Sequence, residues 1–244
     1  MKALVTGVAG FIGSTLAERL VRAGDDVVGI DCFTDYYPRS VKERNLAQLR
    51  AAPNFRFVEG RIQDVDLQTL LADRTQVFHL AAQAGVRKSW GRDFDVYTSN
   101  NIEATQRLLE ACVGTAVERV VYASSSSVYG DLVAMPMRED ALPQPVSPYG
   151  VSKLAAEQLC YLYHVNYGVP TVALRYFTVY GPRQRPDMGF HKFLRATIEG
   201  RPISVFGDGE QTRDFTFVED AVSATAAAAL HSARFLASGG WRAK

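Results

Sequence analysis

Short apolar runs alternate with longer amphipathic runs along the first 175 residues of the chain. Each apolar run is nearly continuous, which is typical of strands in a parallel sheet that are buried on both faces. The predicted strands are Ala3–Thr6, Asp26–Ile30, Phe55–Glu59, Gln76–Leu80, Arg119–Ser124 and Thr171–Arg175. The predicted helices between them are Gly13–Ala23, Val41–Arg50, Val65–Leu71, Asp95–Cys112 and Tyr149–Tyr167. Because parallel strands need right-handed crossovers, this order predicts an α/β fold, a Rossmann-type doubly wound sheet with helices on both faces.

The pattern changes after about Arg175, where loops rich in Pro, Gly and Arg replace the regular alternation. The elements predicted beyond this point are a helix at Phe190–Glu199, strands at Ile203–Phe206 and Gln211–Phe217, and an Ala-rich helix from Val218. We therefore predict a large domain over residues 1–175 and a smaller C-terminal lobe over residues 176–244.

Composition narrows the function classes without changing the predicted fold. A chain of 244 residues can bury a core without disulfides or metals. With 27 basic and 26 acidic residues, the net charge of +1 argues against a broad surface for nucleic acid or an anionic membrane. Cys32, Cys112 and Cys160 are widely spaced and read as reduced thiols, with no zinc motif. The sequence has neither a leader nor a membrane-spanning run, which predicts a soluble, cytoplasmic protein.

A glycine-rich turn follows the first predicted strand and opens the first predicted helix. Its glycines, Gly7, Gly10 and Gly13, have the spacing G-x-x-G-x-x-G. The first glycine allows a tight turn, the second lets a pyrophosphate approach the backbone, and the third allows close helix packing. The helix N-terminus adds N–H donors and positive potential. Glycines also form plain turns, but the order of strand, loop and helix favours a dinucleotide site.

Asp31 follows the second predicted strand, where a carboxylate can accept hydrogen bonds from both hydroxyls of an adenosine ribose. Its alternative role is that of a helix cap or turn residue. The next residues, Cys32 and Phe33, offer no cation for a 2′-phosphate. The segment therefore favours NAD over NADP.

Tyr149 and Lys153 lie four residues apart on a predicted helix and hence on the same face. A neighbouring cation lowers the pKa of a phenol, so we expect Tyr149 to act as an acid or base near neutral pH. The same spacing is also common in solvated helical pairs.

Together, the glycine loop and the Tyr-Lys pair resemble the extended branch of the short-chain dehydrogenase/reductase superfamily. Other matching segments are His79-Leu80-Ala81-Ala82, Asn101-Ile102-Glu103-Ala104-Thr105, Ser124-Ser125-Ser126-Ser127-Val128-Tyr129-Gly130 and Arg175-Tyr176-Phe177-Thr178-Val179-Tyr180-Gly181-Pro182. The resemblance implies an NAD site formed by Gly7, Gly10, Phe11, Ile12, Gly13, Asp31, Phe33, Ile62, Leu80, Ala81, Ala82, Asn101, Tyr149, Lys153 and Tyr176. Otherwise His79 reads as a core imidazole, and the serines as groups that satisfy the backbone at a strand end.

The triple serine bears on the type of reaction. In the pattern of this family, Ser125 lies beside the tyrosine and bonds the 4-OH of the substrate, and Ser126 and Ser127 complete the catalytic set. The related 4,6-dehydratases carry an acidic pair at these last two positions, and the related decarboxylases a Ser-Glu pair. Elimination or removal of a C5 proton needs such an acid or base, so the serines favour epimerisation.

Further segments resemble the nucleotide-sugar 4-epimerases, and most closely the UDP-glucuronate 4-epimerases. They are Asp31-Cys32-Phe33-Thr34-Asp35-Tyr36-Tyr37, Ala81-Ala82-Gln83-Ala84-Gly85-Val86-Arg87, Gly181-Pro182-Arg183-Gln184-Arg185-Pro186-Asp187-Met188 and Gly207-Asp208-Gly209-Glu210-Gln211-Thr212-Arg213-Asp214-Phe215. The resemblance implies that Arg213 holds the pyrophosphate of the sugar nucleotide, that Phe206 packs on uracil and that Arg87 contacts the substrate. Galactose epimerases usually have Asn at Thr178, so we expect Thr178 and Arg185 to receive a C6 carboxylate. Arg185 otherwise reads as a surface charge.

The resemblance implies UDP-glucuronate 4-epimerisation, in which Tyr149 takes the 4-OH proton, Lys153 stabilises the phenolate and binds the ribose, and a 4-keto sugar turns over in the pocket. The alternatives are a UDP-glucose 4-epimerase, a UDP-glucuronate decarboxylase and a non-catalytic NAD-binding module. The helices at Asp95–Cys112 and Tyr149–Tyr167 match those of a dimer interface in relatives, which predicts a homodimer.

Two features depart from the family pattern. Arg61-Ile62 stands where relatives usually have an acidic residue followed by an aliphatic one near the adenine, and we expect Ile62 to line that pocket. Family members are also longer, and nothing in His231–Lys244 resembles their final strand and helix. We therefore expect a complete NAD domain and a truncated, partial nucleotide-sugar lobe.

Overall fold

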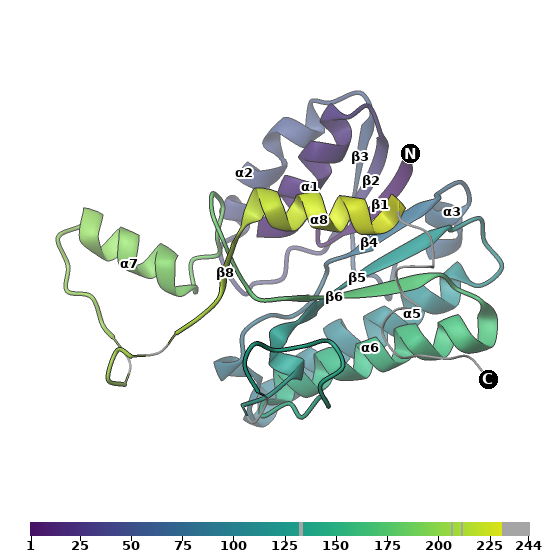
Figure 1. The fold of residues 1–244 in the computed structure, drawn as a ribbon. Coiled ribbons are helices and arrows are strands. Elements are labelled where there is room, and N and C mark those ends of the chain that lie inside the picture. Colours follow the sequence, from purple (N-terminus) through teal and green to yellow (C-terminus); the bar gives the residue numbers. More distant parts are fainter. Residues whose placement is uncertain (132–133, 206, 211, 231–244) are drawn as a thin grey trace.

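A six-stranded parallel sheet forms the centre of the molecule, with strand order β3-β2-β1-β4-β5-β6 (Figure 1). The computed structural model describes residues 1–131, 134–205, 207–210 and 212–230. The strands are β1 (Lys2–Thr6), β2 (Asp26–Asp31), β3 (Phe55–Glu59), β4 (Gln76–His79), β5 (Arg119–Ser125) and β6 (Thr171–Tyr176). Each strand end lies within one residue of its predicted position, and the predicted doubly wound α/β fold is confirmed.

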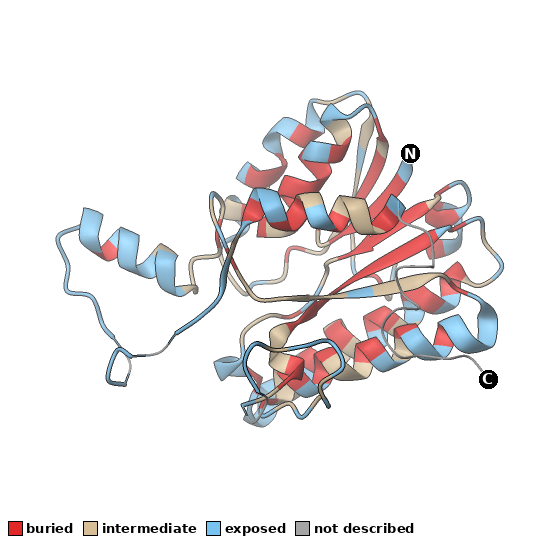
Figure 2. Cartoon of the chain, viewed as in Figure 1, coloured by how far each residue is buried: buried red, intermediate tan, exposed pale blue. Residues whose placement is uncertain are grey.

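Helices cover both faces of this sheet. One face carries α1 (Phe11–Arg22), α2 (Arg39–Arg50) and α8 (Val218–Leu230), and the other carries α3 (Leu67–Leu71), α5 (Ala104–Cys112) and α6 (Pro148–Tyr167). In β1, Leu4 packs in one hydrophobic core while Ala3 and Val5 pack in the other. Successive strand residues point to opposite faces, so a sheet covered on both faces needs the unbroken apolar runs seen in the sequence. Figure 2 shows the resulting buried band along the central strands.

The predicted helix over Asp95–Cys112 is interrupted. The chain forms α4 (Phe94–Tyr97), then a π-helical segment η3 (Thr98–Glu103), then α5. Short 3₁₀ turns precede α4 and follow β5: η1 (Arg87–Ser89), η2 (Gly91–Asp93) and η4 (Ser126–Val128). A π-helical turn is rare and often occurs at functional sites, and here it contains the buried Asn101.

The C-terminal part differs most from the prediction. It contains β7 (Thr178–Tyr180), α7 (Gly189–Ile198) and β8 (Phe215–Phe217), and β7 and β8 pair as a small parallel sheet. The strand predicted over Ile203–Phe206 is wrong for the described residues 203–205, which are exposed and lie in no sheet. The strand predicted from Gln211 begins only at Phe215, and β7 was not predicted. The short apolar runs here give too little signal to separate strand from loop.

The last helix of the described chain belongs physically to the core of the large sheet. Ala221 and Val222 of α8 are buried in the same cluster as Leu16 and Leu20 of α1. Helix α7 stands apart from both and is mostly exposed (Figures 1 and 2). In the described part of the chain, no helix combines the length and apolarity needed to cross a bilayer.

Candidate active site

A cavity opens at the carboxyl ends of the parallel strands, beside the point where the strand order reverses between β1 and β4. This is the position at which doubly wound sheets bind ligands. The glycine loop, the end of β2 and the end of β4 contribute to its wall, as do Tyr149 and Lys153 of α6 and Arg185 from the loop after β7. The cavity thus brings together residues far apart in the sequence.

The glycine loop leaves no room for side chains where it approaches β4 and α1. Gly7 has φ +71°, and a Cβ there would lie 2.8 Å from the backbone of Ala81. A Cβ on Gly13 would collide with the carbonyl group of Gly7, whose carbon would lie 2.9 Å away. Helix α1 begins at Phe11 with Gly10 as its N-cap, so its first N–H groups face the cavity without a side-chain cap. This backbone cradle fits a pyrophosphate.

Asp31 is fixed by the backbone around it. Its carboxylate accepts hydrogen bonds from the amide of Ala9 at 3.1 Å and from that of Phe33 at 2.9 Å. Phe33 does not line the cavity; it has φ +49° and is buried beneath the guanidinium of Arg39, which lies 4.1 Å from the ring centre. Asp31 itself does line the cavity, so its carboxylate can also meet a ribose.

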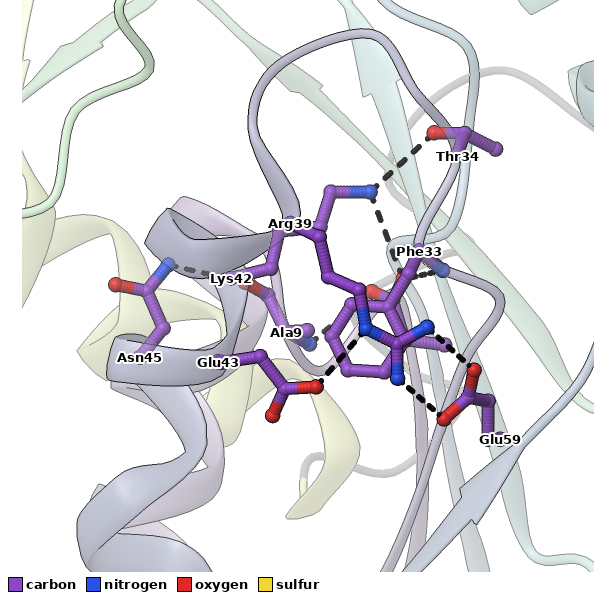
Figure 3. Close-up of polar contacts among 9 residues, drawn as sticks. Ala9, Phe33, Thr34, Arg39, Lys42, Glu43, Asn45 and Glu59 are labelled. Atoms are coloured by element: carbon purple, nitrogen blue, oxygen red, sulfur yellow. Dashed lines mark hydrogen bonds and ion pairs between the residues drawn. The ribbon is translucent and has the colours of Figure 1, made fainter.

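A buried cation lies beside Asp31, although Cys32 and Phe33 provide none. Lys42 of α2 places its Nζ atom 3.7 Å from the carboxylate of Asp31 and 3.3 Å from the hydroxyl of Thr34 (Figure 3). Arg39 is engaged elsewhere, through a bidentate pair with Glu59 and a bond to Glu43. The residues next to Asp31 in the sequence give no sign of Lys42, which lies 11 positions further along the chain. Lys42 lies about one turn of α2 after Arg39, and its side chain lines the cavity.

The cavity continues past Ile62, which lines it together with Arg61, Leu80, Ala81 and Ala82. Ile62 is buried, whereas Arg61 is exposed and donates a hydrogen bond to the hydroxyl of Ser99 at 2.9 Å. Arg61 therefore borders the cavity from its rim.

Tyr149 and Lys153 share the cavity-facing side of α6, as their spacing predicts. The helix begins with Ser147 as N-cap, whose hydroxyl accepts from the amide of Gly150 at 3.1 Å, and with Pro148 in its first turn. This cap places Tyr149 in the first turn. Its ring lies edge-on to that of Tyr97, with 6.2 Å between the centres.

The expected lowering of the Tyr149 pKa by Lys153 is wrong for the protein alone. Burial raises the pKa of Tyr149 above its usual value, and a hydrogen bond from Ser125 and the charge of Arg185 only partly offset this. Burial also lowers the pKa of Lys153, to about 8. Desolvation dominates because both groups are enclosed, and it acts in opposite directions on a phenol and an ammonium.

The four serines at the end of β5 and in η4 lie at different depths. Ser124 lines the cavity, Ser125 is buried and accepts a hydrogen bond from the amide of Ser127 at 3.2 Å, and Ser126 and Ser127 are half-buried in η4. The hydroxyl of Ser124 donates to Glu157, which forms a bidentate pair with Arg175. This tie between β5, β6 and α6 was not anticipated. Glu157 lies one helical turn after Lys153, so the spacing alone places both side chains on the same face of α6.

Asn101 is part of the support beneath the cavity, while its neighbour Asn100 forms the wall. The Asn101 side chain accepts from the amide of Gln83 at 2.7 Å and donates to the hydroxyl of Ser152 at 2.9 Å. Ser152 in turn donates to the carbonyl of Tyr149 at 2.7 Å. The π-helical segment is therefore tied to the turn of α6 that carries the tyrosine.

His79 is a buried, neutral group. Its ring nitrogens lie 2.7 Å from the Thr6 hydroxyl and 2.9 Å from the Thr105 hydroxyl. Burial lowers the pKa of His79 to about 3. The alternative reading of His79 as a satisfied core imidazole fits these contacts.

The residues expected to meet the sugar nucleotide are only partly assembled. Arg185 lines the cavity, as does Tyr176, which was expected at the NAD site. Thr178, Arg87 and Arg213 do not; Thr178 pairs with Phe215 in the small sheet, and the exposed Arg213 bonds the carbonyl of Thr212. Phe206 and His231–Lys244 lie outside the described residues.

Comparison with known proteins supports the same class of site. Residues 3–238 match the NAD dependent epimerase/dehydratase family. The chain is 48% identical over 223 residues to the uncharacterized UDP-glucose epimerase YtcB of Bacillus subtilis, covering 91% of this chain and 70% of that protein. It is 42% identical to the UDP-glucuronate 4-epimerase of Thermodesulfobacterium geofontis, covering 92% and 70%. A crystal structure of UDP-glucuronic acid 4-epimerase from Bacillus cereus, in complex with UDP-glucuronic acid and NAD, superposes with a TM-score of 0.92 at 50% identity, covering 95% and 74%.

Proposed function

The chain belongs to the NAD dependent epimerase/dehydratase family, and on that premise we propose that it is an NAD-dependent isomerase that inverts C4 of a UDP-sugar, converting UDP-glucuronate to UDP-galacturonate through a 4-keto intermediate. The observation that carries the proposal is the cavity in which the glycine loop, the Tyr149-Lys153 pair and Arg185 face one space. NAD, when bound, supplies a reversible acceptor for the hydrogen on C4.

The side chains around the cavity bind the substrate and transfer its protons. Tyr149 takes the proton of the 4-OH and later returns it, while Ser125 bonds the same hydroxyl and Lys153 binds the ribose. The positive charges of Lys153 and Arg185 stabilise the phenolate. Arg185 and Thr178 receive the C6 carboxylate, and Arg87 and Arg213 contact the rest of the UDP-sugar.

The serines after β5 favour epimerisation over the two alternative reactions. Ser126 and Ser127 provide hydroxyls where dehydration or decarboxylation needs a carboxylate. The presence of Tyr149, Lys153 and Ser125 together argues against a non-catalytic module. UDP-glucose remains the alternative substrate, because the B. subtilis relative carries that sugar in its name.

Incubation of the purified protein with UDP-glucuronate and NAD tests the proposal. We expect UDP-galacturonate to form until a stable ratio of the two epimers is reached, with no net consumption of NAD. A pentose as the sole product would assign the decarboxylase function instead. Conversion of UDP-glucose but not of UDP-glucuronate would assign the neutral-sugar epimerase.

We expect the buried ammonium of Lys153 to lower the free energy of unfolding of the protein. Its folded pKa of about 8 lies below the unfolded value, so the folded state disfavours the charged form. This destabilisation is fully present below pH 8, and it decreases as the pH rises from 8 to about 10.4, where the unfolded lysine also loses its proton. We therefore expect Lys153→Met to abolish turnover but to raise the unfolding temperature at pH 7, and to raise it less at pH 10. A variant that is destabilised at both pH values would contradict the pKa assignment.

We also propose a homodimer that forms through α5 and α6. Val151, Leu162 and Val165 are exposed apolar side chains on α6. An apolar helix face is costly to leave in water, and a symmetric pairing of two copies would cover it. We expect sedimentation to give a dimer and Leu162→Glu to give a monomer. A monomeric wild-type protein at micromolar concentration would refute this interface.

A further inference from the structure

Arg185 in the cavity wall forms a half-buried ion pair with Asp187, which has no role in the proposed reaction so far. Arg185 and Asp187 form a bidentate pair, with Nε 3.0 Å from Oδ1 and Nη2 3.1 Å from Oδ2. The hydroxyl of Tyr36, which comes from the loop between β2 and α2, donates to the same Oδ2 atom at 3.2 Å. Segments 151 residues apart in the sequence thus meet at one carboxylate.

The pairing leaves a defined part of the guanidinium available. Arginine has five N–H donors, and Asp187 takes one on Nε and one on Nη2. The other three donors, both on Nη1 and one on Nη2, form the end of the fork. Among the described residues, Asp187 is the one hydrogen-bond partner of this side chain. Arg185 lines the cavity with Tyr149 and Tyr36, whereas Asp187 does not. The guanidinium therefore borders the same space as the reacting tyrosine, while its carboxylate partner is not part of the cavity lining.

The aromatic ring of Tyr36 packs against the pair and limits its movement. The Tyr36 ring lies 5.9 Å from the Arg185 guanidinium carbon and 5.0 Å from the ammonium of Lys88. The side chains of Arg185 and Asp187 are only 25% and 31% exposed. A planar guanidinium held side-on by a carboxylate loses most of its rotamer freedom before any ligand arrives.

We propose that Asp187, itself held by Tyr36, is a positioning residue that aims the free end of the Arg185 guanidinium at the C6 carboxylate and thereby decides whether the 4-keto sugar is epimerised or loses carbon dioxide. This inference rests on the proposed function, because it needs a substrate with a C6 carboxylate. The competing step breaks the C5–C6 bond, releases carbon dioxide and leaves the electron pair on C5, conjugated with the 4-keto oxygen. A proton from water then completes a 4-keto pentose, and the cofactor remains reduced.

The orientation of the carboxylate controls that step. The C5–C6 bond breaks readily only when it overlaps the π system of the 4-keto group. A guanidinium fork fixed in direction holds the carboxylate in one plane, whereas a fork that turns freely does not. The negative charge of Asp187 also offsets the positive charge of Arg185. The ion pair therefore orients an anion without a net charge of its own.

The partition between the two products provides the test. We compare wild type with Asp187→Asn, which keeps the size of the side chain but loses its charge, and with Tyr36→Phe, which removes one hydrogen bond. Arg185→Ala, which removes the guanidinium itself, is measured beside them. Asp140→Asn is the matched control, because Asp140 forms an exposed pair with Arg138. Each protein is incubated with UDP-glucuronate and NAD, and UDP-galacturonate, UDP-4-keto-pentose and reduced nicotinamide are quantified.

We expect Asp187→Asn to raise the ratio of pentose to UDP-galacturonate about tenfold, Tyr36→Phe to raise it less, and the control to leave it unchanged. The ratio is independent of how much protein is folded, so a merely structural role would not change it. If Asp187→Asn does not fold, Tyr36→Phe supplies the same comparison. The inference is overturned if Arg185→Ala raises the ratio while Asp187→Asn and Tyr36→Phe do not. If Arg185→Ala also leaves it unchanged, the carboxylate contact in the proposed function fails as well.

Discussion

Replacing Tyr149 with Phe is expected to lower the turnover of UDP-glucuronate by about 10²- to 10⁴-fold, the usual contribution of a positioned acid-base group. The substitution removes one oxygen from a half-buried ring that lines the cavity. Ser125, Lys153 and Arg185 then have no phenolate to stabilise. Turnover is followed by chromatography of the two epimers, and NAD binding by fluorescence titration.

Tyr167→Phe is the matched control for this prediction. Tyr167 lies at the end of the same helix and is exposed, with its ring packed on that of Tyr163 at 5.5 Å. We expect this variant to keep wild-type turnover, and both variants to keep the wild-type affinity for NAD. Unchanged turnover in Tyr149→Phe would remove the acid-base role from Tyr149.

Replacing Gly13 with Ala is expected to have the second largest effect, on cofactor binding and on stability together. The new Cβ would collide with the carbonyl group of Gly7, and Val8 Cα would lie 3.2 Å away. Both contacts are backbone, so the glycine loop and α1 must move apart. Overpacking of this kind costs about 1–3 kcal/mol of unfolding free energy. A shift of the loop by roughly 1 Å should weaken NAD binding about 100-fold, since the phosphates depend on several aligned N–H groups.

Gly189→Ala is the control that distinguishes a collision at Gly13 from the effect of replacing any glycine with alanine. Gly189 begins α7, and a Cβ there would meet only the Phe193 ring, at 3.9 Å. Thermal unfolding and NAD titration of the two variants should therefore diverge. If Gly13→Ala binds NAD as tightly as Gly189→Ala does, the glycine loop is not the phosphate site.

The sheet and its cofactor loop were predictable because their signals are local. A strand buried on both faces needs a continuous apolar run. Ala3–Thr6 and Arg119–Ser124 have such runs, which favour buried strands. Gly7 and Gly13 are similarly explicit, because a Cβ at either position would collide with neighbouring backbone, and Gly10 completes the spacing. The interruption of the helix at η3 left no such signal. It depends on the bonds of Asn101 to Gln83 and Ser152, which lie in other segments.

Two of the contacts that the sequence did not predict join segments that only the tertiary fold brings together. Lys42 reaches Asp31 from α2, and Tyr36 reaches Asp187 from a loop 151 residues earlier. Neither contact follows from spacing, because both need the tertiary fold. The pKa of Tyr149 was misjudged for a related reason. The helical spacing identifies the neighbouring cation, but the burial that dominates the shift is visible only in the structure.

Deuterium placed on C4 of UDP-glucuronate tests the central claim most directly. Oxidation at C4 followed by return to the other face predicts that UDP-galacturonate keeps the deuterium at C4, even in the presence of excess unlabelled NAD. Mass spectrometry and NMR of the product measure this retention. Full retention, together with a slower rate for the labelled substrate, is the predicted result. Loss of the deuterium to solvent, or its absence from C4 of the epimer, would contradict C4 epimerisation through a 4-keto sugar.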